Sequence, residues 1–155
     1  MTELDVGAQA PDFDLPKAGG GTVRLSALWG KPVVLFFYPK DDTSGCTAEA
    51  IAFSGLRSAF EAAGAIVVGM SPDSVKKHDK FRTKHSLDVD LVADEEKSAL
   101  QAYGVWVEKS MYGRKYMGVE RTTVLIDAEG KIAQIWRKVS VPGHAEAVLE
   151  AVRAL

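Results

Sequence analysis

The chain contains one cysteine, Cys46, and the residues around it offer the clearest chemistry in the sequence. Cys46 follows the apolar run 32–38 and stands at the start of a helix-like segment. A free thiol has a pKa near 8.5, so only about 3% of it is the nucleophilic thiolate at pH 7. Because the macrodipole and the free N–H groups at a helix N-terminus stabilise an anion, this placement predicts an activated sulfur.

Three nearby residues could complete a pocket over that sulfur. The hydroxyl of Thr43, three residues before Cys46, can both donate and accept a hydrogen bond. Pro39 has no N–H, and its ring can shield a thiolate from water. Gly45 allows the backbone to approach a small molecule closely. We therefore predict a tight pocket that suits a small oxygen-containing substrate better than a peptide.

The elements that position Cys46 follow from the hydrophobic pattern. The segments 32–38 and 65–71 are short, apolar and rich in β-branched residues, which is typical of strands buried on both faces. Helical spacing predicts a helix over 43–64 that ends at Gly64. The remaining expected elements are short strands on both sides of the glycine cluster 18–22, a helix from Pro72 or Asp73 to about His85, a strand over 91–94, a helix over 95–103, a hairpin or extended loop over 104–120, paired strands over 121–127 and 131–139, and an amphipathic helix over 144–155.

This order of elements predicts the fold class. Strands that alternate with helices, followed by an antiparallel pair, indicate an α/β sandwich with a mixed sheet. Ligand sites in open α/β sheets cluster at the carboxyl ends of the strands, and Cys46 falls at such a place. Since no linker or repeat interrupts the pattern, we expect a single domain over 1–155.

Composition and charge exclude several classes of protein. The 155 residues are 46% hydrophobic and 26% charged, which is ordinary for a soluble globular domain. With 19 basic and 21 acidic residues, the net charge of -2 favours neither a nucleic-acid partner nor a membrane surface. The acidic stretch MTELDVGAQAPDF is unlike a signal peptide, and no apolar run reaches about 18 residues, so we expect a cytoplasmic protein.

The residues around Cys46 resemble a known family. Pro39, Thr43 and Cys46 match the Pro-x-x-x-Thr-x-x-Cys motif of peroxiredoxins, and FFYPKDDTSGCTAEA is similar to the bacterioferritin-comigratory, or PrxQ, subgroup. The blocks APDFDLP, YMGVERTTVLID and GHAEAVLEAV agree in the same order. The resemblance implies a thioredoxin-like fold with an N-terminal β-hairpin extension and a mixed central sheet flanked by helices. It also implies a thiol peroxidase of the thioredoxin-dependent type.

The same resemblance implies a role for each site residue. Cys46 would be the peroxidatic cysteine, which attacks the O–O bond and becomes a sulfenic acid. Thr43 would hydrogen-bond the peroxide, and Pro39 would shield the thiolate. Arg121 would be the active-site arginine, oriented by Glu49. The residues expected to bind the substrate are Thr43, Gly45, Cys46 and Arg121.

A resolving cysteine is missing from both places where PrxQ relatives carry one. Position 51, five residues after Cys46, is Ile51, and the expected helix from Asp73 to His85 contains no cysteine. The chain therefore resembles a one-cysteine PrxQ. We hypothesise that an external thiol recycles the sulfenic acid after hydrogen peroxide or an organic hydroperoxide has reacted. The candidates are thioredoxin, glutathione with a glutaredoxin, or another small thiol. The subgroup also implies a monomer.

Two other functions are considered beside the peroxidase. A disulfide oxidoreductase of thioredoxin type needs Cys-x-x-Cys, but Ala48 and Glu49 follow Cys46, so this function is not expected. A non-catalytic thioredoxin-fold binding or chaperone module stays open, and an inert thiol would support it. A cysteine–histidine hydrolase would need a histidine beside Cys46, which the layout gives no reason to expect.

The histidines give no sign of a metal site. His78, His85 and His144 are scattered without ligand-like spacing, so we expect surface or capping residues, no metal and no cofactor. The run KKHDK at 76–80 is typical of a solvated helix face. Trp106 and Tyr112 precede Arg121 and are candidates for the border of the pocket.

Overall fold

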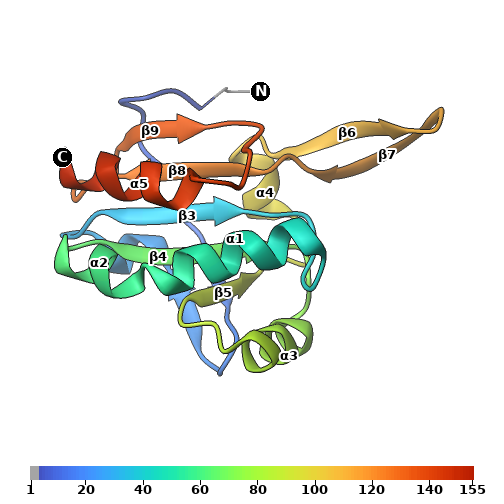
Figure 1. Ribbon diagram of the computed structural model, residues 1–155. Helices are drawn as coiled ribbons and strands as arrows, with labels where there is room; N and C mark the ends of the chain where they lie inside the picture. Colours follow the sequence, from blue (N-terminus) through green and yellow to red (C-terminus); the bar gives the residue numbers. More distant parts are fainter. Residues whose placement is uncertain (1–3) are drawn as a thin grey trace.

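A five-stranded mixed sheet forms the centre of the molecule (Figure 1). The computed structural model describes residues 4–155, so residues 1–3 of the acidic N-terminal stretch lie outside the described part. The strands are, in their order across the sheet, β5 (Asp90–Ala93), β4 (Ile66–Ser71), β3 (Val33–Phe37), β8 (Thr122–Ile126) and β9 (Ile132–Trp136). β3, β4 and β5 run parallel, whereas β8 is antiparallel to both β3 and β9. This sheet confirms the predicted α/β class.

Helices and two small hairpins surround the sheet. The helices are α1 (Ser44–Gly55), α2 (Arg57–Ala62), α3 (Val75–His85), α4 (Ser98–Ala102) and α5 (His144–Arg153), with a short 3-10 turn, η1, at Leu25–Leu28. The hairpins are β1 (Asp14–Pro16) with β2 (Thr22–Arg24), and β6 (Trp106–Met111) with β7 (Arg114–Val119). In Figure 1, α1, α2 and α5 lie in front of the sheet and α4 lies behind it. The β1–β2 pair confirms the expected N-terminal hairpin.

The hydrophobic core has two parts, one on each face of the sheet. Because successive side chains of a strand point to opposite faces, β3 contributes Val34 and Phe36 to one part, and Leu35 and Phe37 to the other. The first part is closed by α1, α2, α3 and α5, and the second by α4 and the N-terminal segment. All five residues of β3 are buried, which explains its uninterrupted apolar sequence.

The long helix expected over 43–64 is divided in two. Leu56 has φ -100 and ψ 5, and it separates α1 from α2. The physical reason lies in Gly55, the last residue of α1, because glycine disfavours a helix by about 1 kcal/mol relative to alanine. Its neighbours in the sequence favour a helix, so the pattern did not indicate a break. The break leaves α1 as the short helix that carries Cys46.

The β6–β7 hairpin extends away from the sheet (Figure 1). Its exposed apolar side chains are Met111, Tyr112, Tyr116 and Met117. In residues 4–155, no helix is both long and apolar enough to cross a membrane.

Candidate functional site

The strand register brings two distant segments together beside Cys46. β3 and β8 pair antiparallel with Phe37 opposite Thr122. The residue that precedes Thr122 is Arg121, so its side chain lies at the carboxyl end of β3, where the chain turns into α1. Cys46 is the third residue of α1. Sheet pairing thus places an arginine at the start of a helix that begins 77 positions earlier in the chain, at Ser44.

The guanidinium of Arg121 bridges a sulfur and a carboxylate. Arg121 Nη2 donates to Cys46 Sγ at 3.3 Å, and Nη1 donates to Glu49 Oε1 at 2.7 Å. Cys46 and Glu49 are each 1% exposed. The Arg121 side chain is 18% exposed and forms the solvent side of the cluster. A fixed positive charge at hydrogen-bond distance favours a negative sulfur, so this geometry supports a nucleophilic Cys46.

Gly45 gives Arg121 the room it needs. A Cβ atom at position 45 would lie 3.2 Å from Arg121 Nη2, closer than most side-chain contacts in proteins. The missing side chain therefore lets the guanidinium approach the helix start. Sequence reasoning had assigned this glycine to substrate approach, and the structure gives it a contact with Arg121.

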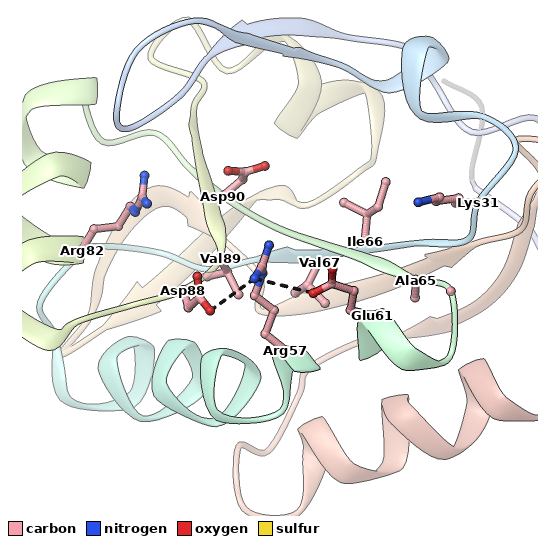
Figure 2. A pocket seen from close by; sticks show the side chains of 11 residues that line it. Lys31, Arg57, Glu61, Ala65, Ile66, Val67, Arg82, Asp88, Val89 and Asp90 are labelled. Atoms are coloured by element: carbon pink, nitrogen blue, oxygen red, sulfur yellow. Dashed lines mark hydrogen bonds and ion pairs between the residues drawn. The ribbon is translucent and has the colours of Figure 1, made fainter. Parts of the chain in front are cut away.

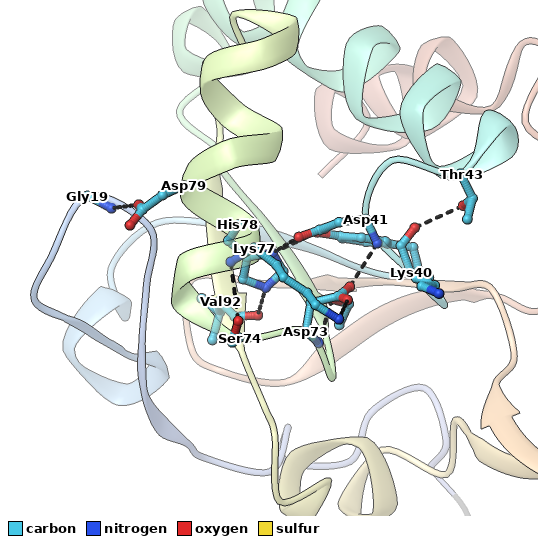
Figure 3. Close-up of polar contacts among 12 residues, drawn as sticks. Gly19, Lys40, Asp41, Thr43, Asp73, Ser74, Lys77, His78, Asp79 and Val92 are labelled. Atoms are coloured by element: carbon cyan, nitrogen blue, oxygen red, sulfur yellow. Dashed lines mark hydrogen bonds and ion pairs between the residues drawn. The ribbon is translucent and has the colours of Figure 1, made fainter.

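Thr43 and Pro39 lie in the loop between β3 and α1. Thr43 is the N-cap of α1, but its hydroxyl donates to Lys40 O at 2.9 Å rather than capping the helix (Figure 3). Because that bond uses the only hydroxyl hydrogen, the oxygen is left free to accept a hydrogen bond. Pro39 is half-buried and Thr43 is exposed. Their roles toward a peroxide stay predictions.

The Glu49 carboxyl is buried with one oxygen unpaired. Burial raises the pKa of Glu49 to about 7, although the charge and hydrogen bond of Arg121 lower it in part. The pKa of Arg121 is also raised, against its own burial, by Glu49 and Cys46. The two shifts point in different directions for the ion pair. The raised pKa of Arg121 favours its charged form, whereas the raised pKa of Glu49 favours its neutral form. The upward direction for Glu49 is the one the geometry supports, because in the described residues Oε2 has no hydrogen-bond partner.

This raised pKa predicts a pH dependence of stability. Between pH 4.5 and about 7, the folded protein keeps a proton on Glu49 that the unfolded chain has lost. The stabilisation from Glu49 is therefore lost as the pH rises through this window. We expect the free energy of unfolding of the wild type, relative to Glu49→Gln, to fall by roughly 3 kcal/mol across it and to level off above. Urea denaturation of both proteins at several pH values measures this difference, and a difference that stays flat or rises with pH would contradict the prediction.

One residue near the site was missed by sequence reasoning. Lys109, on β6, has a lowered pKa, first because it is partly buried and then because Arg121 lies nearby, while Cys46 and Glu120 act in the opposite direction. It belongs to the hairpin that precedes Arg121, and nothing local in the sequence marks its proximity to the site. Of the two aromatic residues considered for the pocket border, Tyr112 is 99% exposed at the tip of the hairpin and does not line a pocket there.

The prediction that the histidines are surface or capping residues was wrong for two of them. His78 is 0% exposed and His144 is 7% exposed. His144 Nε2 shares a hydrogen bond with Thr123 Oγ1 at 2.8 Å, and its pKa is lowered by burial and by the charge of Arg121. His78 also contradicts the solvated face expected for KKHDK. Whether a helix face is buried depends on what packs against it. The charged residues next to His78 in the sequence give no sign of that packing.

A separate cavity of about 240 Å³ lies away from Cys46 (Figure 2). Ile66 and Val67, at the start of β4, line it, whereas Cys46 follows the end of the parallel strand β3. Arg57 reaches into it and pairs with Asp88 at 3.3 Å and Glu61 at 3.7 Å. The predicted site residues do not line this cavity, so it gives no support to a function at Cys46.

The family follows from comparison with known proteins. The model of the AhpC/TSA family matches residues 6–135. The chain belongs to the AhpC/TSA family. It is 44% identical over 150 residues to peroxiredoxin Bcp of Bacillus subtilis, with 97% of this chain and 96% of that protein covered. It is 45% identical over 156 residues to peroxiredoxin Bcp of Xanthomonas campestris, with 99% and 98% covered.

Solved structures of peroxiredoxins agree with this assignment. A structure of Xanthomonas campestris peroxiredoxin Q has a TM-score of 0.90 at 44% identity and covers 97% of this chain and 96% of its own. Peroxidoxin BcpB of Mycobacterium tuberculosis has a TM-score of 0.87 at 36% identity, with 99% of each chain covered. The predicted thioredoxin-like fold and the PrxQ resemblance are confirmed. This peroxiredoxin is a thiol peroxidase, and its single cysteine fits the one-cysteine mechanism.

Proposed function

We propose that this peroxiredoxin reduces hydrogen peroxide and organic hydroperoxides at Cys46, and that an external thiol completes each cycle. The observation that carries the proposal is the Arg121 guanidinium, which contacts Cys46 Sγ at 3.3 Å while Glu49 holds it at 2.7 Å. Solved structures of the bacterioferritin comigratory protein of Xanthomonas campestris concern its alkyl peroxide reduction activity. This relative supports organic hydroperoxides as substrates here. Thr43 and Gly45 complete the proposed substrate site.

In the first step the Cys46 thiolate attacks the nearer peroxide oxygen. A sulfur–oxygen bond forms and the O–O bond breaks. The departing oxygen takes a proton from solvent, which balances the one that the thiol released on ionising, and leaves as water or an alcohol. The sulfur loses two electrons and becomes a sulfenic acid. Negative charge moves from sulfur to the departing oxygen, and the donors of Arg121 and the N–H groups of the first turn of α1 are fixed in place to stabilise it.

In the second step an external thiol attacks the oxidised sulfur. Water leaves and a mixed disulfide forms, and a second thiol then releases the Cys46 thiol and a disulfide product. In the described residues Cys46 is the only cysteine, and it is 1% exposed. That burial also disfavours a disulfide between the Cys46 residues of two chains.

The two candidate reductants can be separated by one experiment. Peroxide consumption is followed at steady state with thioredoxin, thioredoxin reductase and NADPH, and separately with glutathione, glutaredoxin and glutathione reductase. We expect turnover to saturate with one of the two systems. If neither sustains turnover although peroxide oxidises Cys46 rapidly, the proposed reductants are wrong and the peroxidase step stands.

A sulfenic acid without a fast partner is open to further oxidation. With excess peroxide and no added thiol, we expect Cys46 to reach sulfinic acid, because no resolving thiol within the chain can trap the sulfenic form. Mass spectrometry of the peptide that carries Cys46 should show a gain of two oxygen atoms. Thiol added together with the peroxide should suppress the gain, and an unchanged peptide mass at high peroxide would contradict the prediction.

A further inference from the structure

A second polar cluster is buried behind the loop that leads into α1 (Figure 3). It consists of Tyr38, Asp41, Ser71, Asp73 and His78, all of them at most 9% exposed. None of these residues belongs to the Cys46–Arg121–Glu49 group. A buried polar cluster is costly unless its members satisfy one another, so its hydrogen bonds show what it does.

The hydrogen bonds of His78 require one proton on Nε2 and a second proton between Nδ1 and Asp41. His78 Nε2 lies 2.9 Å from Val92 O, a carbonyl that can only accept, so Nε2 carries a hydrogen. His78 Nδ1 lies 2.6 Å from Asp41 Oδ2, and two acceptors at that distance would repel without a hydrogen between them. The His78–Asp41 pair therefore holds one proton more than a neutral imidazole beside a carboxylate.

Asp41 Oδ1 and Asp73 Oδ2 also accept hydrogen bonds within the cluster. The Tyr38 hydroxyl donates to Asp41 Oδ1 at 2.6 Å. The pKa of Tyr38 is raised well above its ordinary value by burial and by the charges of Asp41 and Asp73, so this hydroxyl stays a donor. Asp73 Oδ2 accepts from the Asp41 N–H at 2.8 Å and from the Ser71 hydroxyl at 2.6 Å.

These contacts argue against a metal ion in the cluster. Ligand atoms of Asp41, Asp73 and His78 lie within 4.8 Å of one another, which is the spacing of a possible metal site. However, His78 Nδ1 is hydrogen-bonded to Asp41 Oδ2 at 2.6 Å, and Asp73 Oδ2 already accepts two hydrogen bonds, so these atoms are used within the cluster. Hydrogen bonds among its own side chains and backbone groups hold the cluster together.

The cluster ties the active-site loop to α3 and to β5, the strand at the edge of the sheet. Asp41 lies between Pro39 and Thr43, and both its side chain and its N–H are held by residues outside the loop. His78 belongs to α3 and reaches β5 through Val92. The loop in turn ends at Thr43, the N-cap of the helix that carries Cys46. The position of the helix start is therefore fixed from α3 and β5.

We propose that His78 is a positioning residue that holds this loop closed through its hydrogen bond to Asp41 and the shared proton. We call the hydrogen-bonded pair of His78 and Asp41 the latch. With the latch closed, the first turn of α1 and Arg121 surround the sulfur for reaction with a small peroxide. Cys46 is then only 1% exposed, so a larger thiol reaches the sulfur only when the loop is released. The second half of this inference rests on the proposed recycling by an external thiol. The latch favours the peroxide step and slows the thiol step.

Opposite changes in the two steps test the latch. The peroxide step is measured in a stopped-flow instrument without reductant, and the thiol step by mixing the sulfenic form with dithiothreitol. We expect His78→Leu to slow the peroxide step and to accelerate the thiol step, each by roughly tenfold, because a lost buried hydrogen bond shifts the loop toward release. A merely destabilised protein would change both rates in the same direction.

Matched variants complete the test. His78→Asn places an amide N–H near the position of Nδ1 and keeps the bond to Asp41, so we expect it to restore most of the closed state. Thr83→Ala, at an exposed position of the same helix, is the control that should leave both rates unchanged. If His78→Leu does not fold, Tyr38→Phe removes one bond to Asp41 and should change the two rates in the same opposite directions, to a smaller extent.

Three results would overturn the latch: both rates changing in the same direction, neither rate changing, or His78→Asn being as impaired as His78→Leu. Failure of the recycling proposal is distinguishable from these. If dithiothreitol does not reduce the sulfenic form of the wild type, the external-thiol step is wrong. The peroxide rates of His78→Leu and His78→Asn then still decide whether His78 positions the loop.

Discussion

Replacement of Cys46 by serine is expected to lower the rate of peroxide reduction by at least about a thousandfold. A serine hydroxyl is not ionised near neutral pH, so Arg121 has no anion to stabilise, and oxygen does not form the sulfenic acid. Single-turnover stopped-flow measurement of tryptophan fluorescence with hydrogen peroxide, without reductant, gives the rate directly. The control is Ala48→Ser, which adds a hydroxyl at an exposed position of the same helix and should react like the wild type.

Either outcome of this experiment is informative. A fast change that disappears in Cys46→Ser assigns the peroxide step to this sulfur. A wild-type rate no faster than that of a free thiol at the same pH would mean that the pocket does not activate Cys46. The non-catalytic binding module would then become the better description, and the family would describe the fold of this chain alone.

Replacement of Arg121 by methionine is expected to slow the peroxide step by about 10²–10³-fold, the cost of removing one preorganised donor from an active site. The change removes the bond of 3.3 Å to Cys46 Sγ and leaves Glu49 buried without its partner. Since Arg121 is the group that lowers the pKa of Glu49, that pKa should rise further. We also expect the variant to lose up to about 3 kcal/mol of stability at pH 8, where an unpaired Glu49 is costly to ionise.

A double variant separates the two effects of Arg121. Combining Arg121→Met with Glu49→Gln removes the unpaired carboxylate, so urea denaturation should show that most of the lost stability returns. The rate of the peroxide step should stay low, because the donor to the sulfur is still missing. A double variant that regains the rate would show that Arg121 acts only through stability. Arg121→Lys should react at an intermediate rate, because one ammonium group cannot bridge Cys46 and Glu49 as the planar guanidinium does.

The buried strands and the helix start at Cys46 could be predicted because local patterns specify them. β3 is apolar on both faces, which is typical of a buried strand. The segment that follows has the spacing of a helix, and α1 begins there. Arg121 was found through the family motif, and the register of Phe37 with Thr122 supplies the physical reason for its position. The break at Leu56 was missed because the cost of one glycine inside a helix is small, about 1 kcal/mol, and many helices tolerate it.

The second cluster could not be predicted for a different reason. His78 stands in the charged run KKHDK, where its neighbours indicate solvent, yet it is fully buried against Tyr38 and Asp41. Tyr38 and Asp41 come from the loop after β3 and His78 from α3, and only the assembled fold brings them together. Likewise, Lys109 on β6 lies near Arg121, and no spacing along the chain marks that proximity.

The lone buried sulfur has a consequence for how the protein relates to its surroundings. Under the proposed cycle, oxidation and reduction are separate encounters at the same atom, with no second thiol in the chain to store the oxidising equivalents. The steady-state fraction of oxidised Cys46 then depends only on the supply of peroxide relative to the supply of reducing thiol, each weighted by its rate constant. The molecule thus acts as a ratiometric reporter, whose occupancy compares two metabolite pools rather than measuring either one alone.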